Sequence, residues 1–451
     1  MPDLRAATSA VALMLMVIPA SGHAQSLSEA YAAALRHDPD QAAAEADRDA
    51  SRENDALATS LFRPKAQIEG SAGYSRITSD LDDPANVLPD KVDGVSGGVL
   101  VGVEQPIVDG SARAQARQLR AGARAGDAKF QASRQQLGLR VVQAYLDVLK
   151  AQDMLASLTA QEASARREQR AAQARFDAGR AKITDVREAQ ASADGVAARI
   201  VSAGAQHDLA VARFQELTGL DVGSLPRIMP DLVPALPEGD LSQWQDEAER
   251  QAPVILARKE QVTAGEAAID QYAWSSQLKV TGRAAYGQAW RGGNDPALLG
   301  VIVPPGSVGG FFAGVQVKLP LYTGGALEAQ RRQASAQARG AQAQLDATRR
   351  DIRLQVQEAW LSQRSSSAQI TALRTALASA QLQERAALTG REVGVRTQSD
   401  VLAAQAQTFE VKRQLDQALY EYEYSRAALA ASAGGLTSAR LDEIGRDFTP
   451  R

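Results

Sequence analysis

The sequence predicts an α+β membrane protein. Its strands form part of a transmembrane β-barrel shared between copies of the chain, and its long helices form a coiled coil that continues from the barrel. Three observations predict this class: an N-terminal export segment, four strands in which apolar and polar residues alternate, and two helices too long for a globular domain. The 451 residues carry a net charge of −3, contain no cysteine and are 5% aromatic. This composition excludes disulfides, Cys-ligated metals and thiol catalysis, and it argues against nucleic-acid binding over a broad basic surface.

Residues 1–24 have the pattern of a secretory signal peptide. The apolar run 10–20 is too short to span a membrane, and Gly22 and Ala24 occupy the small-residue positions before a cleavage site. An uncleaved anchor is the alternative. Since no later segment has 18 consecutive apolar residues, a membrane span in the rest of the chain must be built of strands.

The mature chain contains two copies of one structural unit. Matched pairs at a nearly constant offset are Leu27 with Leu241, Pro39 with Pro253, Gly179 with Gly394, and Asp185 with Asp400. The two repeats are expected at 25–219 and 241–436. A linker rich in proline and glycine is expected at 220–240, and a C-terminal tail at 437–451.

Each unit contains two strands. Apolar and polar residues alternate at 66–74, 95–103, 278–286 and 311–321. This alternation fits a barrel wall between lipid and water, although a soluble sandwich would also show it. Four strands cannot close a membrane barrel, whose smallest members have about eight, so the chain is expected to oligomerise. The strands alone leave open whether two or three copies do so.

Each unit also contains a very long helix. From 111 to 179 no proline interrupts a helical pattern of about 65 residues, or roughly 100 Å. A second long helix is expected at about 325–390, and heptad spacing gives both a coiled-coil seam. Shorter helices at 27–61 and 184–217 together match one long helix, so they are expected to lie end to end beside it. A solid coiled-coil bundle is the alternative.

Two helical hairpins carry a resemblance to a known family. Residues 174–190 (ARFDAGRAKITDVREAQ) and 391–407 (REVGVRTQSDVLAAQAQ) resemble the paired helix-turn-helix signatures of TolC-like outer-membrane efflux proteins. The resemblance covers the whole mature chain. It implies a trimer whose twelve-stranded outer-membrane barrel, with four strands from each protomer, continues into an α-helical tunnel in the periplasm of a Gram-negative cell.

The resemblance also implies a function and partners. The family's trimer is an exit duct, which a periplasmic adaptor joins to an inner-membrane transporter of the RND, ABC or MFS type. It contacts outer-membrane lipid, exports drugs, toxic small molecules or polypeptides, catalyses no reaction and needs no cofactor. A passive porin and a soluble periplasmic scaffold are the alternatives. The sequence does not indicate the cargo, the adaptor or the pump.

The resemblance places a gate at the periplasmic tip of the tunnel, where the hairpins turn. The matching residues are Thr184, Asp185, Arg391, Arg396 and Asp400. Asp400 falls where the family has a ring of carboxylates, which favours cations on a threefold axis. The ring is expected to be weaker here because Ala403 replaces the second carboxylate. Because Arg391 replaces a tyrosine, the latch bonds are expected to differ.

The same hairpins contain the turns at which an adaptor is expected to dock: Gly179, Arg180, Gly394 and Val395. Arg180 stands where an apolar residue is more usual, so adaptor pairing is expected to be altered. Capping of a helix start is the simpler role for Asp185, and for Asp400 capping and a pore role are both open. Arg396 fits either a latch contact or a solvated charge. The sequence contains no catalytic motif and no metal-binding motif.

Overall fold

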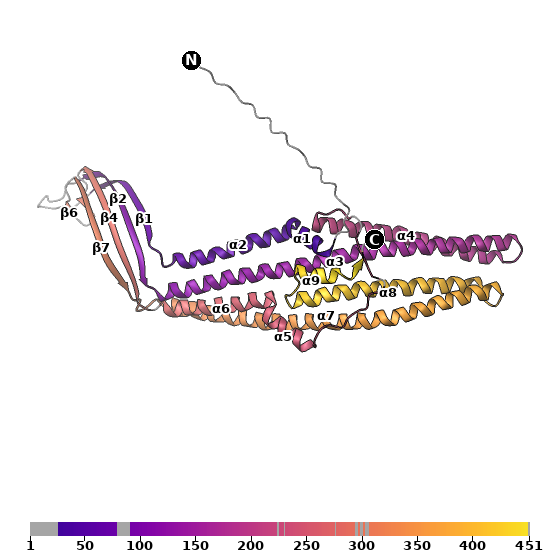
Figure 1. The fold of residues 1–451 in the computed structure, drawn as a ribbon. Helices are drawn as coiled ribbons and strands as arrows, with labels where there is room; N and C mark the ends of the chain where they lie inside the picture. The colour runs from indigo at the N-terminus through magenta and orange to yellow at the C-terminus, as the bar shows by residue number, and fades with distance from the viewer. Residues whose placement is uncertain are drawn as a thin grey trace, which may run out of the picture.

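The computed structural model describes residues 26–78, 91–222, 225–229, 231–275, 277–293, 296–297, 301–302 and 306–449. The predicted signal peptide lies outside the described residues. The described chain is an elongated rod with a sheet at one end and two helical hairpins at the other (Figure 1). None of the helices described is long and apolar enough to cross a membrane.

The elements occur in the same order twice along the chain. The first series is α1 Leu27–His37, α2 Pro39–Ser60, β1 Lys65–Thr78, β2 Lys91–Val108, α3 Gly110–Asp177 and α4 Ile183–Thr218. The second series is α5 Leu241–Gln251, α6 Pro253–Trp274, β4 Lys279–Gly293, β7 Gly306–Lys318, α7 Ala326–Glu392 and α8 Gln398–Ser432. The offset between the starts of corresponding elements is nearly constant. Between β4 and β7 lie the short strands β5 Pro296–Ala297 and β6 Val301–Ile302.

The four long strands form one antiparallel sheet in the order β1–β2–β4–β7. The register places Ile68, Val101, Tyr286 and Phe311 side by side across the sheet. Since alternate residues of a strand point to opposite faces, these four side chains share one face. They are 43 to 76% exposed in the single chain. The sheet therefore presents an apolar face that requires cover by lipid or protein.

The expectation of one helix over 27–61 is wrong, because this segment is two helices. Asp38 between them is extended, with φ −69° and ψ 118°, and α2 begins at Pro39. A proline ring clashes with a helical residue before it, whereas proline itself fits the first turn of a helix. Ala252 and Pro253 separate α5 from α6 in the same way.

The shorter helices run beside the long ones. α2 packs on α3 in the half nearer the sheet, and α4 packs on it in the half that ends at the tip (Figure 1). Likewise, α6 packs on α7 in the half nearer the sheet, and α8 packs on α7 in the half that ends at the tip. α3 has 68 residues and α7 has 67, so each is about 100 Å long. α8 also packs on α3 and thereby joins the two hairpins.

The main hydrophobic core lies near the middle of the rod. The ring of Tyr145 in α3 meets those of Phe214 and Phe448 edge to face, with centroids 6.2 and 5.9 Å apart. Phe448 belongs to β8 Phe448–Thr449, which follows α9 Ser438–Gly445 and pairs with β3 Arg227–Ile228. The segments expected as a linker and a tail therefore meet in a small sheet. We call residues 225–229, 231–235 and 446–449 the equatorial strap.

Candidate functional site at the hairpin tips

Two glycines form the turns at the tips of the hairpins. Gly179 follows α3 with φ 71°, and Gly394 follows α7 with φ 80°. Residues with a Cβ rarely adopt this left-handed conformation. The amide of Arg180 donates to the carbonyl of Arg175 at 2.8 Å, and an equivalent 2.8 Å bond closes the end of α7. Each long helix thus ends in a tight turn that reverses the chain.

Aspartates cap both helices that follow the turns. Asp400 Oδ2 accepts from the amide of Thr397 at 2.8 Å, and Thr397 Oγ1 accepts from the amide of Asp400 at 3.1 Å. These hydrogen bonds to Thr397, together with the charge of Arg396, lower the pKa of Asp400. Asp185 Oδ2 accepts from the amide of Lys182 at 3.2 Å. Both carboxylates therefore stabilise a helix start, and a pore role for Asp400 stays a prediction.

A polar network joins the two hairpins next to these turns. Arg391, at the end of α7, forms an ion pair with Glu168 of α3, and their side chains are only 14% and 13% exposed. Gln398 Oε1 accepts from Arg391 Nη1 at 3.1 Å and from Arg175 Nη2 at 3.0 Å. Gln398 Nε2 donates to Glu168 Oε2 at 3.4 Å. This network, which we call the tip latch, ties α3 to both helices of the second hairpin.

The structure brings only one of the five predicted gate residues, Arg391, into the tip latch. Thr184 and Arg396 are exposed, and Asp185 and Asp400 cap helices. Nothing in the sequence alone singles out Glu168, Arg175 or Gln398. Glu168 and Arg175 are one heptad apart, which places them on one face of α3. Because charged residues are frequent on these helices, that spacing does not distinguish them.

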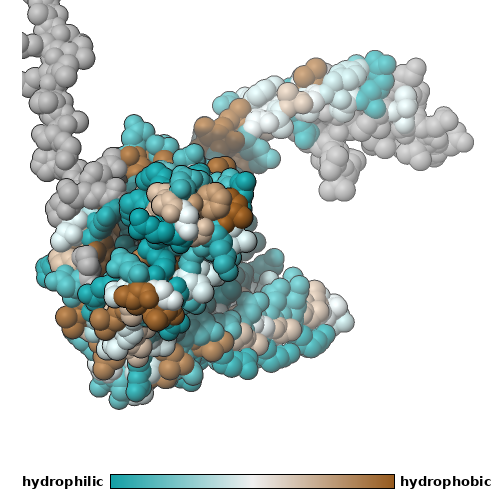
Figure 2. Space-filling model, turned by 90° about the vertical axis from the view of Figure 1, so that its right-hand side faces the viewer, coloured by the Kyte–Doolittle hydropathy of each residue, from teal (hydrophilic) through white to brown (hydrophobic). Residues whose placement is uncertain are grey.

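The turns also expose apolar side chains at the end of the rod. Phe176 and Ile183 flank the first turn and are 37% and 46% exposed. Val393 and Val395 in the second turn are 70% and 76% exposed. Seen from the tip end, hydrophobic patches stand out from a mostly hydrophilic surface (Figure 2). Exposed apolar side chains that gather on one surface are typical of contact with another protein.

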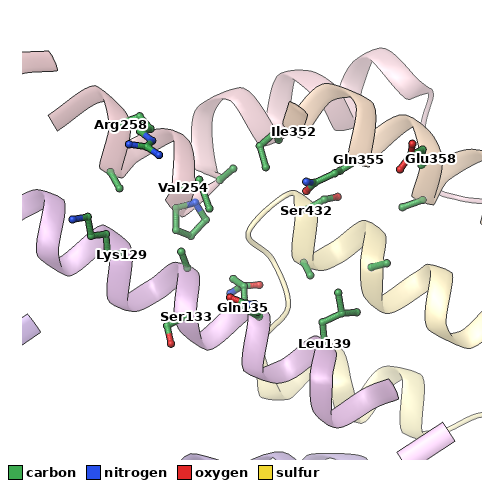
Figure 3. Close-up of a pocket in the computed structure, with 18 of the residues that line it drawn as sticks. Lys129, Ser133, Gln135, Leu139, Val254, Arg258, Ile352, Gln355, Glu358 and Ser432 are labelled. Carbon is green, nitrogen blue, oxygen red and sulfur yellow. The ribbon is translucent and has the colours of Figure 1, made fainter. Parts of the chain in front are cut away.

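A cavity of about 1000 Å³ lies away from the tips, where the end of α8 meets the start of α6 (Figure 3). α3 contributes Lys129 and Gln135, α6 contributes Arg258, and α7 contributes Gln355 and Glu358. Amide, hydroxyl and aliphatic groups make up most of the lining. The part of the chain that the structure describes contains no group of three metal-ligating side chains. The cavity marks the gap between two helices that meet end to end.

Known proteins share this architecture. The sequence matches the family described as "Outer membrane efflux protein" over residues 30–220 and 244–435. This chain belongs to that family. It is 29% identical over 427 residues to outer membrane protein TolC of Vibrio cholerae, covering 93% of each protein. It is 25% identical over 453 residues to the alkaline protease secretion protein AprF of Pseudomonas aeruginosa, covering 96% of this chain and 89% of AprF.

The fold agrees with that membership in the outer membrane efflux protein family. The solved outer-membrane channel OprN matches with a TM-score of 0.78 at 20% identity, over 91% of this chain and 90% of OprN. The family predicted from the two hairpin segments is confirmed. The chain is accordingly a protein of the Gram-negative outer membrane with its helical part in the periplasm. The relatives it matches are outer-membrane channel proteins rather than enzymes.

Proposed function

We propose that three copies of this efflux-family chain form an exit duct across the outer membrane. The observation that carries the proposal is a sheet at the end of a rod about 100 Å long. Its edge strands β1 and β7 have no further partner among the described residues, and one of its faces is apolar and exposed. Pairing β7 of one copy with β1 of the next closes twelve strands and leaves no edge. Lipid then covers the apolar face, and the helices continue the duct into the periplasm. The chain itself has no enzymatic role.

The internal duplication supports a specific contact between copies. Within one chain, Leu146 of α3 and Tyr424 of α8 line the same cavity, and Leu146 is 5% exposed. Their counterparts in the other repeat are Leu361 of α7 and Leu209 of α4, which are 47% and 51% exposed. Repeated units tend to repeat their contacts. We therefore expect α7 of one copy to pack on α4 of the next, as α3 packs on α8 within a copy.

The tip latch supports a gate at the periplasmic end. The ion pair of Arg391 and Glu168 and the bonds of Gln398 hold the second hairpin against the first, and their release would let the two part. Asp400 is proposed to line the constriction as a ring of three carboxylates. Thr184, Asp185 and Arg396 would surround that ring near the turns.

The exposed turns support docking of a periplasmic adaptor. Apart from the adjacent residues, no described atom lies within 4 Å of the position that a Cβ would occupy at Gly179 or Gly394, so a partner can approach their backbone. Arg180 and Val395 beside them are exposed. The adaptor would link the duct to an inner-membrane transporter that supplies the energy.

Two cargo classes fit this duct. The family is named for efflux, and the relative AprF is named for protease secretion. Small toxic molecules and unfolded polypeptides can both pass through a water-filled tunnel. We propose efflux of small molecules as the principal function, with polypeptide secretion as the second candidate.

Single-channel conductance in a planar bilayer tests the proposal, with the mass of the detergent-purified protein measured on the same sample. The expected result is a trimer with small, cation-preferring currents, because the closed tip restricts flow. A water-soluble protein without conductance would overturn the duct and favour a periplasmic scaffold. Large currents with no binding to any periplasmic adaptor would favour a passive porin.

A further inference from the structure

The seam where α3 packs on α8 contains carboxylates at positions where the proposed contact between α7 and α4 of neighbouring copies would contain apolar residues. Asp416 of α8 corresponds to Val201 of α4 in the first repeat. Asp153 of α3 corresponds to Ala368 of α7 in the second repeat. In the proposed contact between α7 and α4 of neighbouring copies, these positions would therefore be apolar. The two carboxylates in the α3–α8 seam need another explanation.

Asp416 lies in the seam with little compensation for its charge. It lines two cavities of about 340 and 20 Å³ between α3, α8 and the equatorial strap. Asp153 is satisfied, since it accepts a hydrogen bond from the hydroxyl of Tyr420 and pairs with Arg227 of the strap at 3.1 Å. Asp416 has no hydrogen bond and no ion pair to a described residue, although it shares both cavities with Asp153 and Tyr420.

Charged and titratable groups face Asp416 from three elements. They are Lys150 and Asp153 of α3, Arg227 of β3, and Lys412, Arg413 and Tyr420 of α8. Arg413 Nη2 forms an ion pair with Glu410 Oε1 at 2.5 Å. The described residues that line the two cavities include no charged group from α4 or α7. Burial raises the pKa of Asp416 to about 6; the charge of Asp153 adds to this rise, and the charges of Lys412 and Arg227 oppose it.

We propose that Asp416 makes this seam an acid-operated clasp, which holds the second hairpin against the first when Asp416 is protonated. Protonation removes a half-buried charge and its repulsion from Asp153. Ionisation instead favours a state in which the seam parts and water hydrates the carboxylate. This inference rests on the proposed duct, because parting of the hairpins would loosen the tip latch.

The direction of the effect follows from the two states of the carboxyl group. In the closed seam the pKa is about 6, and in the parted seam we expect it near the ordinary value of 3.8. The closed state therefore gains stability as the pH falls from about 6 to 3.8, and the gain levels off outside this range. Each pKa unit changes the ratio of the two states tenfold, so the full effect is at most about 100-fold.

A distance between the two tips tests the clasp in the full-length protein. The natural chain has no cysteine, so Asp177→Cys and Glu392→Cys place spin labels on exposed residues at the ends of α3 and α7. Labelled protein is diluted into unlabelled protein so that each assembly holds at most one labelled copy. Pulsed electron paramagnetic resonance should give mainly the short distance at pH 4, a longer population that grows as the pH rises from 4 to 6, and little further change between pH 7 and pH 8.

Substitutions at position 416 decide whether this carboxyl group is the cause. Asp416→Asn and Asp416→Val, the second of which copies the residue at the counterpart position, should keep the short distance at every pH. Asp208→Asn is the matched control, because that side chain is 85% exposed on α4, and it should retain the pH dependence. The clasp is overturned if the distance between the tips in the wild-type protein does not change with pH. It is also overturned if both Asp416 variants keep the pH dependence of the wild type.

Bilayer conductance of the same samples separates this inference from the proposed duct. A protein that conducts but shows no pH-dependent tip distance overturns the clasp and leaves the duct. A protein that shows the pH-dependent distance but never conducts supports the clasp and overturns the duct. Circular dichroism of each variant confirms that it is folded before either result is used.

Discussion

Arg391 and Glu168 form an ion pair across the two hairpins of one chain, although they belong to different repeats of the sequence. Both side chains are nearly buried, at 14% and 13% exposure. Loss of one partner of a buried ion pair is strongly destabilising because it leaves the other charge without compensation. The pair therefore stabilises the contact between the two hairpins at the tip.

Glu168→Gln should open the tip. The substitution leaves Arg391 without its carboxylate and weakens the joined state by roughly 1.5–3 kcal/mol, the range for hydrogen bonds to charged groups. Conductance in a planar bilayer should rise and become noisier. Glu162→Gln is the control, because Glu162 pairs with Arg166 on the same helix at 3.5 Å. Equal conductance of Glu168→Gln and the wild type would exclude the latch role.

Gly179→Ala should destabilise the first tip turn. Its φ of 71° is costly for a residue with a Cβ, by roughly 1–2 kcal/mol. The free energy of unfolding, from urea titration, should fall by about that amount. Gly195→Ala in the middle of α4 should do the opposite by about 0.5–1 kcal/mol, since that position is helical and has no atom near the added methyl group. Equal effects of the two substitutions would contradict the turn argument.

Leu361→Asp should prevent assembly without unfolding the monomer. The side chain is 47% exposed in one chain, and burial of a leucine contributes about 1.5–3 kcal/mol at each proposed interface. Light scattering in detergent should show a shift from trimer to monomer. Val233→Asp, on an 83% exposed strap residue, should leave the trimer intact. A trimer that persists in Leu361→Asp would refute the proposed contact between α7 and α4.

Asp400→Ala should reduce cation selectivity if the carboxylate ring lines the constriction. Removing three negative charges from a threefold axis lowers the attraction for cations, so the reversal potential in a salt gradient should move toward zero. Asp240→Ala removes a capping carboxylate from the start of α5, away from the tips, and controls for loss of a helix cap. An unchanged reversal potential in Asp400→Ala would leave Asp400 with a capping role alone.

Because of Glu423, the free energy of unfolding of the protein should be lower at high pH. Its side chain is fully buried beside Arg426 at 2.9 Å, and burial raises its pKa to about 8 from 4.5. Because the folded chain holds this proton more tightly than the unfolded one, stability falls as the pH rises from 4.5 to 8 and then levels off. The slope is at most about 1.4 kcal/mol per pH unit.

Urea titrations between pH 6 and pH 8 measure this slope. The window lies above the pKa of Asp416, which is about 6, so Asp416 contributes little to it. Glu423→Gln should flatten the slope, and Glu421→Gln, on an exposed residue of the same helix, should not. A wild-type protein whose urea midpoint is constant across this range would disprove the assignment.

The local features of this protein could be predicted from its amino-acid sequence. Alternation of period two indicated the apolar strand face that includes Ile68 and Phe311, and heptad spacing indicated α3 and α7. The turn glycines Gly179 and Gly394 and the cap residue Asp400 also follow from local chemistry. Such features depend only on backbone geometry within a few residues. The same reasoning applied to Pro39 would have predicted the break that divides α1 from α2.

Contacts between residues far apart in the sequence could not be predicted in this way. Glu168 pairs with Arg391, Asp153 with Arg227, and Tyr145 packs on Phe448 from the opposite end of the chain. On a helix of 3.6 residues per turn, a shift of one residue rotates a side chain by about 100°. Contacts between long helices therefore depend on their relative register and rotation. The packing of the whole rod fixes these quantities, and no local pattern in the sequence encodes them.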